Sequence, residues 1–180
     1  MHIAISSEKI DLSSEEKTEK LAGRFFKKIK PGDTVFLYGE MGVGKTTFIR
    51  YLINKFQKES KLGITEVTSP TFNLLNEYKI NDVKINHYDL FRLKSIEEIK
   101  NLDLFENNSK VITLIEWPEI IEKRPDNLIE LIFSDSAISL ELKIFSNSNF
   151  FFGSKFEFVK RYNKVFFFSV IIHNPHCNEV

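Results

Sequence analysis

The feature that most constrains this chain is a glycine-rich segment between two stretches of different hydrophobic pattern. Residues 39–46 read Gly-Glu-Met-Gly-Val-Gly-Lys-Thr and fit the motif G-x-x-x-x-G-K-[ST]. The apolar run Val-Phe-Leu-Tyr at 35–38 precedes it and is typical of a buried parallel strand. Apolar residues then recur with a helical period from Phe48 to Phe56. A strand, a glycine-rich turn and a helix in this order predict a phosphate-binding loop.

The residue types of this loop suit a ligand that carries several negative charges. Backbone N–H groups of a glycine-rich turn converge on phosphate oxygens, and the following helix offers unpaired N–H donors at its positive end. A Cβ at the glycine positions would crowd the phosphates or resist the required dihedral angles. We expect Lys45 to reach the β and γ oxygens and Thr46 to offer its hydroxyl to Mg²⁺. The residues expected to bind the nucleotide here are Gly39, Glu40, Met41, Gly42, Val43, Gly44, Lys45, Thr46 and Thr47.

Two acidic residues end predicted apolar strands and are candidates for a second anchor of the metal. Asp89 follows the run 85–88, and Glu116 follows the run 111–115. Carboxylates at strand ends project towards the crevice where ligands bind in an open α/β sheet. Asp89 is the predicted partner of Mg²⁺. Glu116 is predicted to hold the metal, directly or through water, or to orient the attacking water. From position alone, the capping of a strand explains each carboxylate equally well.

The turn Ser69-Pro70-Thr71-Phe72 is a third candidate for the site. A hydroxyl-rich turn after the helix of the loop can act as a switch that senses the γ-phosphate, here through Thr71. Considered alone, the segment is more often an ordinary turn.

The sequence constrains the nucleotide and the reaction only in part. The guanine-specific patterns N-K-x-D and D-x-x-G occur nowhere in the chain, which favours ATP over GTP. A small-molecule kinase usually carries an arginine-rich lid, and here Arg92 and Arg124 are isolated. The leading expectation is a Mg²⁺-dependent ATP hydrolase. A P-loop small-molecule kinase and a non-catalytic ATP-dependent switch stay open as alternatives.

The pattern around the loop predicts one P-loop ATPase domain over residues 1–146 and a Phe-rich extension over 147–180. A capping box at Ser13–Glu16 starts a helix that is expected to end near Lys30. Strands are predicted at 35–38, 72–80, 83–88, 111–115, 128–133 and 138–144, and short helices after Ser95 and at Pro118. This order predicts the α/β class, a P-loop NTPase-type mixed sheet with a parallel core, antiparallel hairpins and flanking helices. Eight of the 18 Phe fall in 149–180, where we expect an extra hairpin or a poorly ordered end.

Composition and charge limit the classes of function. The 25 basic residues balance the 25 acidic ones, so the chain as a whole is not expected to grip nucleic acid strongly. No basic and apolar leader opens the sequence, and no apolar run reaches the roughly 18–20 residues of a membrane span. Together with the single Cys, these observations predict a cytoplasmic protein without a membrane partner.

Five segments, taken in order, closely resemble one protein family, the bacterial P-loop ATPase TsaE (YjeE type), which serves the threonylcarbamoyladenosine modification of tRNA. The resemblance extends over residues 13–145. Many families share the P-loop, whereas the later segments S-P-T-F, H-Y-D-L-F-R-L and E-W-P-E are far more specific. The five segments are 39–48, Leu62-Gly63, 69–72, 87–93 and 115–119.

The resemblance implies roles for the polar residues of these segments. It implies Thr46, Asp89 and Glu116 around Mg²⁺, and Lys45 on the phosphates of ATP. Phe91 stands where the family commonly has Tyr, which removes a hydroxyl and keeps the aromatic ring. We therefore expect this difference to have little effect.

The resemblance also implies neighbours of the site and partners of the protein. It places Thr71 in a switch, Trp117 next to the site, and the start of the first helix, from Ser14 to Thr18, near the nucleotide base. The implied partners are the threonylcarbamoyl transferase TsaD and its scaffold TsaB, with tRNA involved only indirectly. ATP hydrolysis by TsaE-like proteins is slow alone and is thought to reset that complex between cycles.

Overall fold

The computed structural model of the chain describes residues 9–100, 102, 104–105, 108–134, 139–145 and 166–167. Its helices are α1 (Glu15–Phe26), α2 (Lys45–Glu59) and α3 (Ile96–Lys100), and its short 3-10 turns are η1 (Asn108–Lys110) and η2 (Pro118–Ile120). Its strands are β1 (Lys9–Asp11), β2 (Thr34–Tyr38), β3 (Leu75–Ile80), β4 (Val83–Asp89), β5 (Val111–Glu116), β6 (Leu128–Ser134), β7 (Ser139–Phe145) and β8 (Phe166–Phe167).

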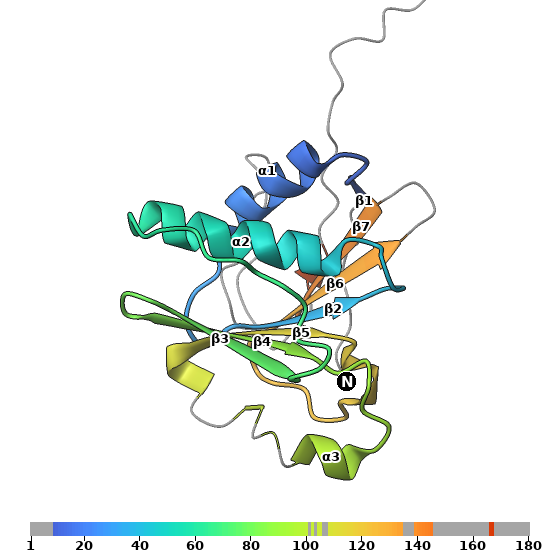
Figure 1. Cartoon of the computed structure of the whole chain (residues 1–180). Coiled ribbons are helices and arrows are strands. Elements are labelled where there is room, and N and C mark those ends of the chain that lie inside the picture. The colour runs from blue at the N-terminus through green and yellow to red at the C-terminus, as the bar shows by residue number, and fades with distance from the viewer. Residues whose placement is uncertain are drawn as a thin grey trace, which may run out of the picture.

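The strands form one mixed sheet in the order β1-β7-β6-β2-β5-β4-β3, and β8 pairs with β7. Strands β6, β2, β5 and β4 run parallel, whereas the pairs β3–β4, β6–β7, β1–β7 and β7–β8 are antiparallel. The predicted mixed sheet with a parallel core and antiparallel hairpins is confirmed. Strand β2 lies inside the parallel core, so the glycine-rich loop that follows it starts at the middle of the sheet (Figure 1).

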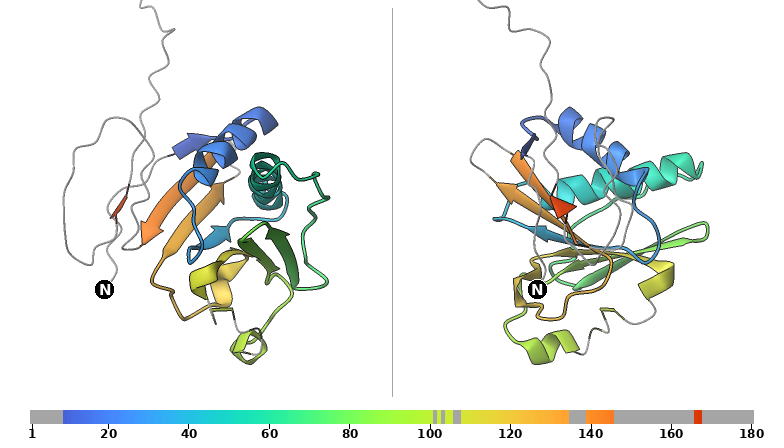
Figure 2. Two further views of the ribbon diagram at one scale, coloured as in Figure 1. Left: turned by 90° about the vertical axis from the view of Figure 1, so that its left-hand side faces the viewer. Right: turned by 180° about the vertical axis from the view of Figure 1, so that it is seen from behind.

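Two apolar cores lie on opposite faces of the sheet, because neighbouring residues of a strand point to opposite sides. In β2, Val35 and Leu37 belong to the core under α1 and α2, whereas Phe36 belongs to the core on the other face. Phe25 of α1 meets Phe48 of α2 edge to face, with ring centroids 5.4 Å apart. Figure 2 shows α1 and α2 together on one side of the sheet and α3 on the other.

Helix α1 is shorter than the sequence pattern predicts. Its N-cap is Ser14, whose hydroxyl accepts a backbone N–H of the first turn at 3.3 Å, so the predicted capping box at Ser13–Glu16 is wrong by one residue. The helix ends at Phe26 rather than near Lys30. The N–H of Lys30 donates to the carboxylate of Asp33 at 2.9 Å, and this turn competes with helical hydrogen bonding over the last residues.

The hairpin of β3 and β4 has the predicted turn, and its first turn residue, Asn81, has a φ of 52°. Strand β3 begins at Leu75, so the prediction that it starts at Phe72 is wrong. The N–H of Leu74 bonds to the carbonyl of Pro70 at 2.6 Å, and the φ of Leu74 is 64°, so residues 70–74 form a tight turn. The other predicted strands agree with the structure to within one residue at each end, and β1 was not predicted.

The predicted boundary at 146–147 lies outside the described residues, as do 147–165 and 168–180. Within the predicted extension, β8 pairs antiparallel with Lys143 and Ile144 of β7. The division into a domain and an extension, and the order of that extension, therefore stay predictions. Across the part of the chain that the structure describes, no helix combines the length and the apolar character needed to cross a membrane.

Candidate functional site

Glycine at three positions shapes the loop between β2 and α2. Gly39, Gly42 and Gly44 have φ angles of 130°, 82° and 103°, a region that residues with a side chain rarely adopt. Gly39 is also crowded, because a Cβ there would lie 2.6 Å from the backbone oxygen of Phe133 on β6. A Cβ on Gly42 or Gly44 would meet nothing within 4 Å, so at these two positions the backbone conformation alone requires glycine.

Helix α2 begins directly after this loop, and its N-cap residue has no side chain that could accept from the first backbone N–H groups. Its N-cap is Gly44, which forms no side-chain hydrogen bond to the first turn, and that turn contains no acidic residue. The free N–H groups and the positive end of the helix dipole favour an anion at this position. The first turn of α2 is therefore suited to a phosphate group.

The ammonium group of Lys45 folds back over the loop. It donates to the carbonyl oxygens of Gly39 at 2.5 Å and Glu40 at 2.9 Å, and it lies 4.0 Å from the ring centroid of Trp117. Burial lowers the pKa of Lys45, and the surrounding carboxylates, with Glu116 the strongest, act in the opposite direction. The site thus holds a buried cation inside a ring of negative charges.

The carboxylate of Glu116, at the end of β5, connects α2 to β4. The hydroxyl of Thr46 on α2 donates to it, lying 2.9 and 3.1 Å from its two oxygens. The Nε2 atom of His87 on β4 lies 2.9 Å from the same carboxylate at Oε1. Glu116 is 3% exposed and His87 is 0% exposed. The orientation of this carboxylate is therefore fixed by contacts from two separate elements.

The carboxylate of Asp89, at the end of β4, binds the turn that precedes β3. Ser69 and Thr71 donate their hydroxyls to its Oδ2 at 2.5 and 2.6 Å. The N–H of Phe91 donates to its Oδ1 at 3.0 Å. Asp89 is paired with Glu116 in the parallel register of β4 and β5. The predicted switch and the two carboxylates among the three predicted metal ligands therefore lie side by side at the end of the sheet.

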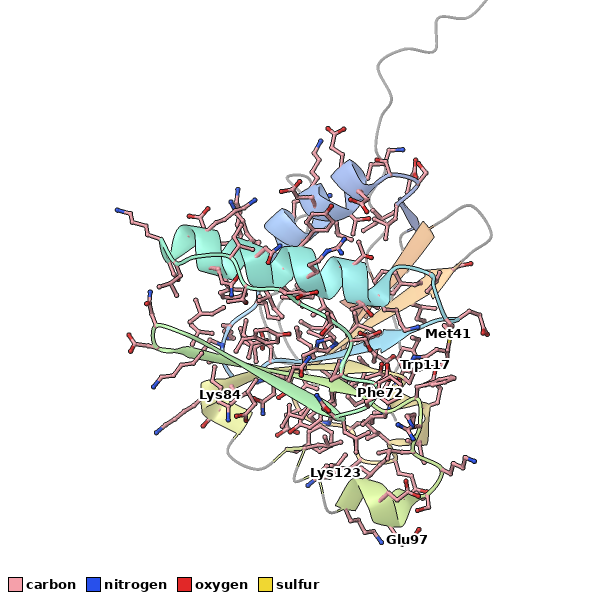
Figure 3. The ribbon with its side chains drawn as sticks, viewed as in Figure 1. Met41, Phe72, Lys84, Glu97, Trp117 and Lys123 are labelled. Carbon is pink, nitrogen blue, oxygen red and sulfur yellow. The ribbon has the colours of Figure 1, made fainter. Side chains whose placement is uncertain are left out.

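These groups line one cavity of about 270 Å³. Its polar lining consists of Lys45, Thr46, Thr47, Ser69, Thr71, Asp89 and Glu116, and its other lining residues are Met41, Gly42, Gly44, Phe91 and Trp117. The rings of Phe91 and Trp117 are 4.8 Å apart, so the ring that replaces the family's Tyr packs on the cavity wall. Figure 3 shows Met41, Phe72 and Trp117 at the end of the sheet where α2 begins, and Lys84 at the opposite end.

A second cavity of about 250 Å³ lies on the other side of the loop, against the start of α1. Its lining residues are Leu12, Ser13, Ser14, Glu15, Thr18, Gly42, Val43, Gly44 and Thr47. Gly42, Gly44 and Thr47 line both cavities, so the loop is the wall between them. A ligand whose phosphates lie in the first cavity can extend past the loop towards Ser14 and Thr18.

The structure brings most of the predicted site residues to these two cavities. Lys45, Thr46, Thr71, Asp89 and Glu116 line the first, and Ser14, Val43 and the start of α1 line the second. Gly39 and Glu40 line neither, and they act on the site through the carbonyl oxygens that hold Lys45. Nucleotide and metal binding by these residues stays a prediction.

Ser69 and His87 form hydrogen bonds to the two strand-end carboxylates, and the sequence patterns indicated a role for neither of them. Ser69 lies two residues before Thr71 and binds the same carboxylate oxygen. His87 lies two residues before Asp89, and side chains two apart in a strand share a face. The two-residue repeat of a strand could therefore have predicted that His87 lies on the same face of the sheet as Asp89.

The oxygen atoms at the end of β4 and β5 fit a magnesium ion. Thr46, Asp89 and Glu116 supply hydroxyl and carboxylate oxygens, and Mg²⁺ is usually held by one or two carboxylates together with substrate phosphates and water. Among the described residues, no group of three or more His, Cys, Asp or Glu side chains could enclose a metal ion. This donor set is therefore suited to a metal that arrives with a phosphate ligand.

Residues 12–144 match the family model described as threonylcarbamoyl adenosine biosynthesis protein TsaE. The tRNA threonylcarbamoyladenosine biosynthesis protein TsaE of Rickettsia conorii is 49% identical over 62% of this chain and 61% of its own length. The protein of the same name from Rickettsia bellii is 49% identical over 67% of this chain and 81% of its own length. That of Borreliella burgdorferi is 33% identical over 75% of this chain and 90% of its own length.

A crystal structure of the Bacillus protein YdiB has a similar fold, with a TM-score of 0.57 at 22% identity over 80% of this chain and 87% of that one. At this identity the likeness concerns the fold alone. The family match, in contrast, runs through the glycine-rich loop, the 69–72 turn and both strand-end carboxylates. It confirms the resemblance found in the five sequence segments, and the chain belongs to the TsaE family.

Proposed function

We propose that this chain binds and hydrolyses ATP with Mg²⁺ and thereby serves the threonylcarbamoyladenosine modification of tRNA. Its proposed partners are a TsaD-type threonylcarbamoyl transferase and a TsaB-type scaffold in the cytoplasm, with tRNA involved only indirectly. The observation that carries the proposal is the joining of Thr46 to Glu116 and of Thr71 to Asp89 in one cavity beside Lys45.

Phosphate binding is assigned to the loop and the first turn of α2. The uncapped N–H groups after Gly44 provide donors, and the ammonium of Lys45 provides charge. An ammonium has three N–H donors, and two of those on Lys45 are directed to the carbonyls of Gly39 and Glu40. Lys45 can therefore stay attached to the loop while it contacts a phosphate oxygen.

Metal binding is assigned to Thr46, Asp89 and Glu116. When bound, Mg²⁺ would neutralise negative charge that develops on the transferring phosphoryl group. The hydroxyl of Thr46 donates a hydrogen bond to Glu116. The lone pairs of the Thr46 hydroxyl oxygen therefore stay available to a cation. Orientation of the attacking water is the alternative role assigned to Glu116, which lines the same cavity as Lys45 and Thr46.

The switch role is assigned to Thr71. Its hydroxyl donates to Asp89 Oδ2 at 2.6 Å, so a change at the metal ligand would reach the 69–74 turn directly. The sugar and base of ATP are assigned to the second cavity, next to Ser14 and Thr18. This placement keeps one nucleotide in contact with both sides of the glycine-rich loop.

The deciding experiment measures phosphate release from ATP by the purified chain, alone and with a purified TsaB–TsaD pair. We expect slow Mg²⁺-dependent turnover that the pair accelerates. Calorimetry with ATP and ADP at saturating Mg²⁺ is run alongside. No heat of binding would contradict the proposal at its first step, and turnover that the pair leaves unchanged would contradict the partner assignment.

The same assay separates the two alternative functions. A small-molecule kinase would release ADP faster when candidate acceptors are added, and a phosphorylated product would appear. A non-catalytic switch would support many cycles of tRNA modification with a variant that binds ATP and cannot hydrolyse it.

A further inference from the structure

We propose that His87 is a positioning residue of this site, and that its Nε2–H group holds the carboxylate of Glu116 in the orientation used for ATP hydrolysis. The inference rests on the proposed function and adds a residue to it. His87 is absent from the lining of both cavities, so it would act through Glu116 and would not touch the nucleotide.

The position of His87 in β4 explains how it reaches the site from inside the protein. Side chains two apart in a strand share a face, so Ile85, His87 and Asp89 point to the same side of the sheet. Ile85 belongs to the apolar core under α1 and α2, and Asp89 lines the first cavity. His87 thus stands between the apolar core and the polar site, and it is 0% exposed.

The contacts of the imidazole determine which ring nitrogen carries the proton. Nε2 lies 2.9 Å from Oε1 of Glu116, and an ionised carboxylate can only accept, so Nε2 is the donor. Nδ1 of His87 is buried and has no hydrogen-bond partner among the residues that the structure describes. A proton on Nδ1 would be a buried unpaired donor, which is unfavourable. The geometry therefore assigns a proton to Nε2, which donates to Glu116.

The two hydrogen bonds to Glu116 differ in how a ligand would affect them. Thr46 lines the cavity and is itself a proposed ligand of Mg²⁺, so its bond to Glu116 is exposed to changes on binding. His87 is itself fully buried and lines neither cavity, so a ligand in either cavity would not contact it directly. The hydrogen bond from His87 to the Glu116 carboxylate is therefore expected to persist when a ligand binds, whereas the bond from Thr46 is expected to change.

A histidine that only fills space in the core is the competing explanation, and a matched pair of variants separates the two. His87→Gln keeps an N–H donor near the position of Nε2, whereas His87→Leu fills a similar volume without any donor. A packing role predicts similar effects for both variants. A positioning role predicts that the Gln variant regains much of the function that the Leu variant loses.

The first measurement compares ATP turnover and ADP binding of the full chain and the two variants, with Mg²⁺ and with EDTA. Loss of a partner that orients a metal ligand typically costs about 10–100-fold in metal affinity or activity. We expect His87→Leu to lose that much in kcat, while nucleotide affinity with Mg²⁺ stays within a few-fold, as it should for Glu116→Ala. Affinity in EDTA should stay within about twofold, since the phosphate contacts of the loop are intact. Equal losses in both variants, or none in the Leu variant, would overturn the inference.

The second measurement leaves His87 in place, and so it decides the matter even if a variant does not fold. The chain has four His, and substitution of the other three (His2, His173 and His176) by Gln leaves one imidazole to observe by nitrogen NMR. We expect a slowly exchanging proton on Nε2, and faster exchange when Glu116→Ala is added. A proton on Nδ1 alone would overturn the inference.

The failures of the inference and of the proposed function can be told apart. If the unaltered chain neither binds nor hydrolyses ATP with Mg²⁺, the proposed function fails and the inference fails with it. If the unaltered chain hydrolyses ATP and His87→Leu does so equally well, the inference alone fails.

Discussion

The floor and the rim of the first cavity are built in opposite ways. The floor consists of the side chains of Lys45, Asp89 and Glu116. These residues are 3–4% exposed, and each forms hydrogen bonds within the protein. Two exposed apolar side chains from separate loops provide the contrast and are called the rim. Met41 lines the cavity and is 69% exposed, whereas Phe72 follows the lining residue Thr71, does not itself line the cavity, and is 85% exposed.

The difference shows which part of the site is fixed before any ligand binds. Buried polar groups are costly unless they are fully bonded, so each floor residue is held by partners from another element. Phe72 has a much weaker constraint, with the guanidinium of Arg92 5.2 Å from its ring centroid. We therefore expect the floor to govern nucleotide chemistry, and the rim to tolerate substitution in the isolated protein.

The largest expected effect is on binding, at the cation of the floor. Lys45→Ala should weaken ATP affinity by at least about 100-fold, since charge-assisted hydrogen bonds contribute roughly 1.5–3 kcal/mol each. Calorimetry with Mg²⁺ and ATP measures this, and Lys58→Ala is the matched control, because Lys58 pairs with Glu19 on the surface of the two helices. Similar affinities for the two variants would remove Lys45 from the site.

The next effect separates binding from turnover within the floor. Glu116→Ala should keep ATP binding within a few-fold and lower the hydrolysis rate by about 100-fold, as the loss of a preorganised electrostatic group does. The variant also leaves the buried His87 N–H unpaired, which costs about 1–3 kcal/mol of folding stability. A thermal melt therefore accompanies the assay. Hydrolysis at the normal rate would show that the role assigned to Glu116 is wrong.

The smallest expected effect is that of a substitution on the rim, and it tests whether floor and rim really differ in their importance for ATP binding and turnover. Phe72→Ala should change ATP affinity and intrinsic turnover by less than about twofold, and folding stability by less than about 0.5 kcal/mol, as surface substitutions usually do. The same calorimetry and melts check both values. A loss as large as that of Glu116→Ala would place Phe72 in the floor and remove the contrast between the two parts.

The elements of the fold were largely predictable, because each has a local signature. The strand predicted at 83–88 and the turn at 81–82 lie within one residue of those observed, and the helical period after the glycine-rich loop predicted α2. Local competition explains the misses. The left-handed backbone at Leu74 prevents β3 from beginning before Leu75, and the Asp33 carboxylate accepts a backbone N–H that a longer α1 would use. Neither feature can be recognised from the pattern of hydrophobic residues.

The candidate site was predictable where the motif fixes both residue type and spacing. Residues 39–46 are contiguous, so their sequence alone indicates a phosphate-binding loop. Ser69 and His87 went without a role because a hydroxyl or an imidazole at a given position has many explanations. Only their partners, Asp89 and Glu116, give them one.

The sequence by itself determined the glycine-rich loop between a strand and a helix, the alternating elements and the family, since all of these are carried by neighbouring residues in the chain. The tertiary structure decided which side chains meet at the end of the sheet. Thr46 and Glu116 are 70 residues apart in the sequence and 2.9 Å apart in space, because parallel strands bring their carboxyl ends to one edge and α2 starts at that edge. Contacts of this range depend on which strands become neighbours in the sheet, and the pattern within one segment does not specify the order of strands that are far apart in the chain.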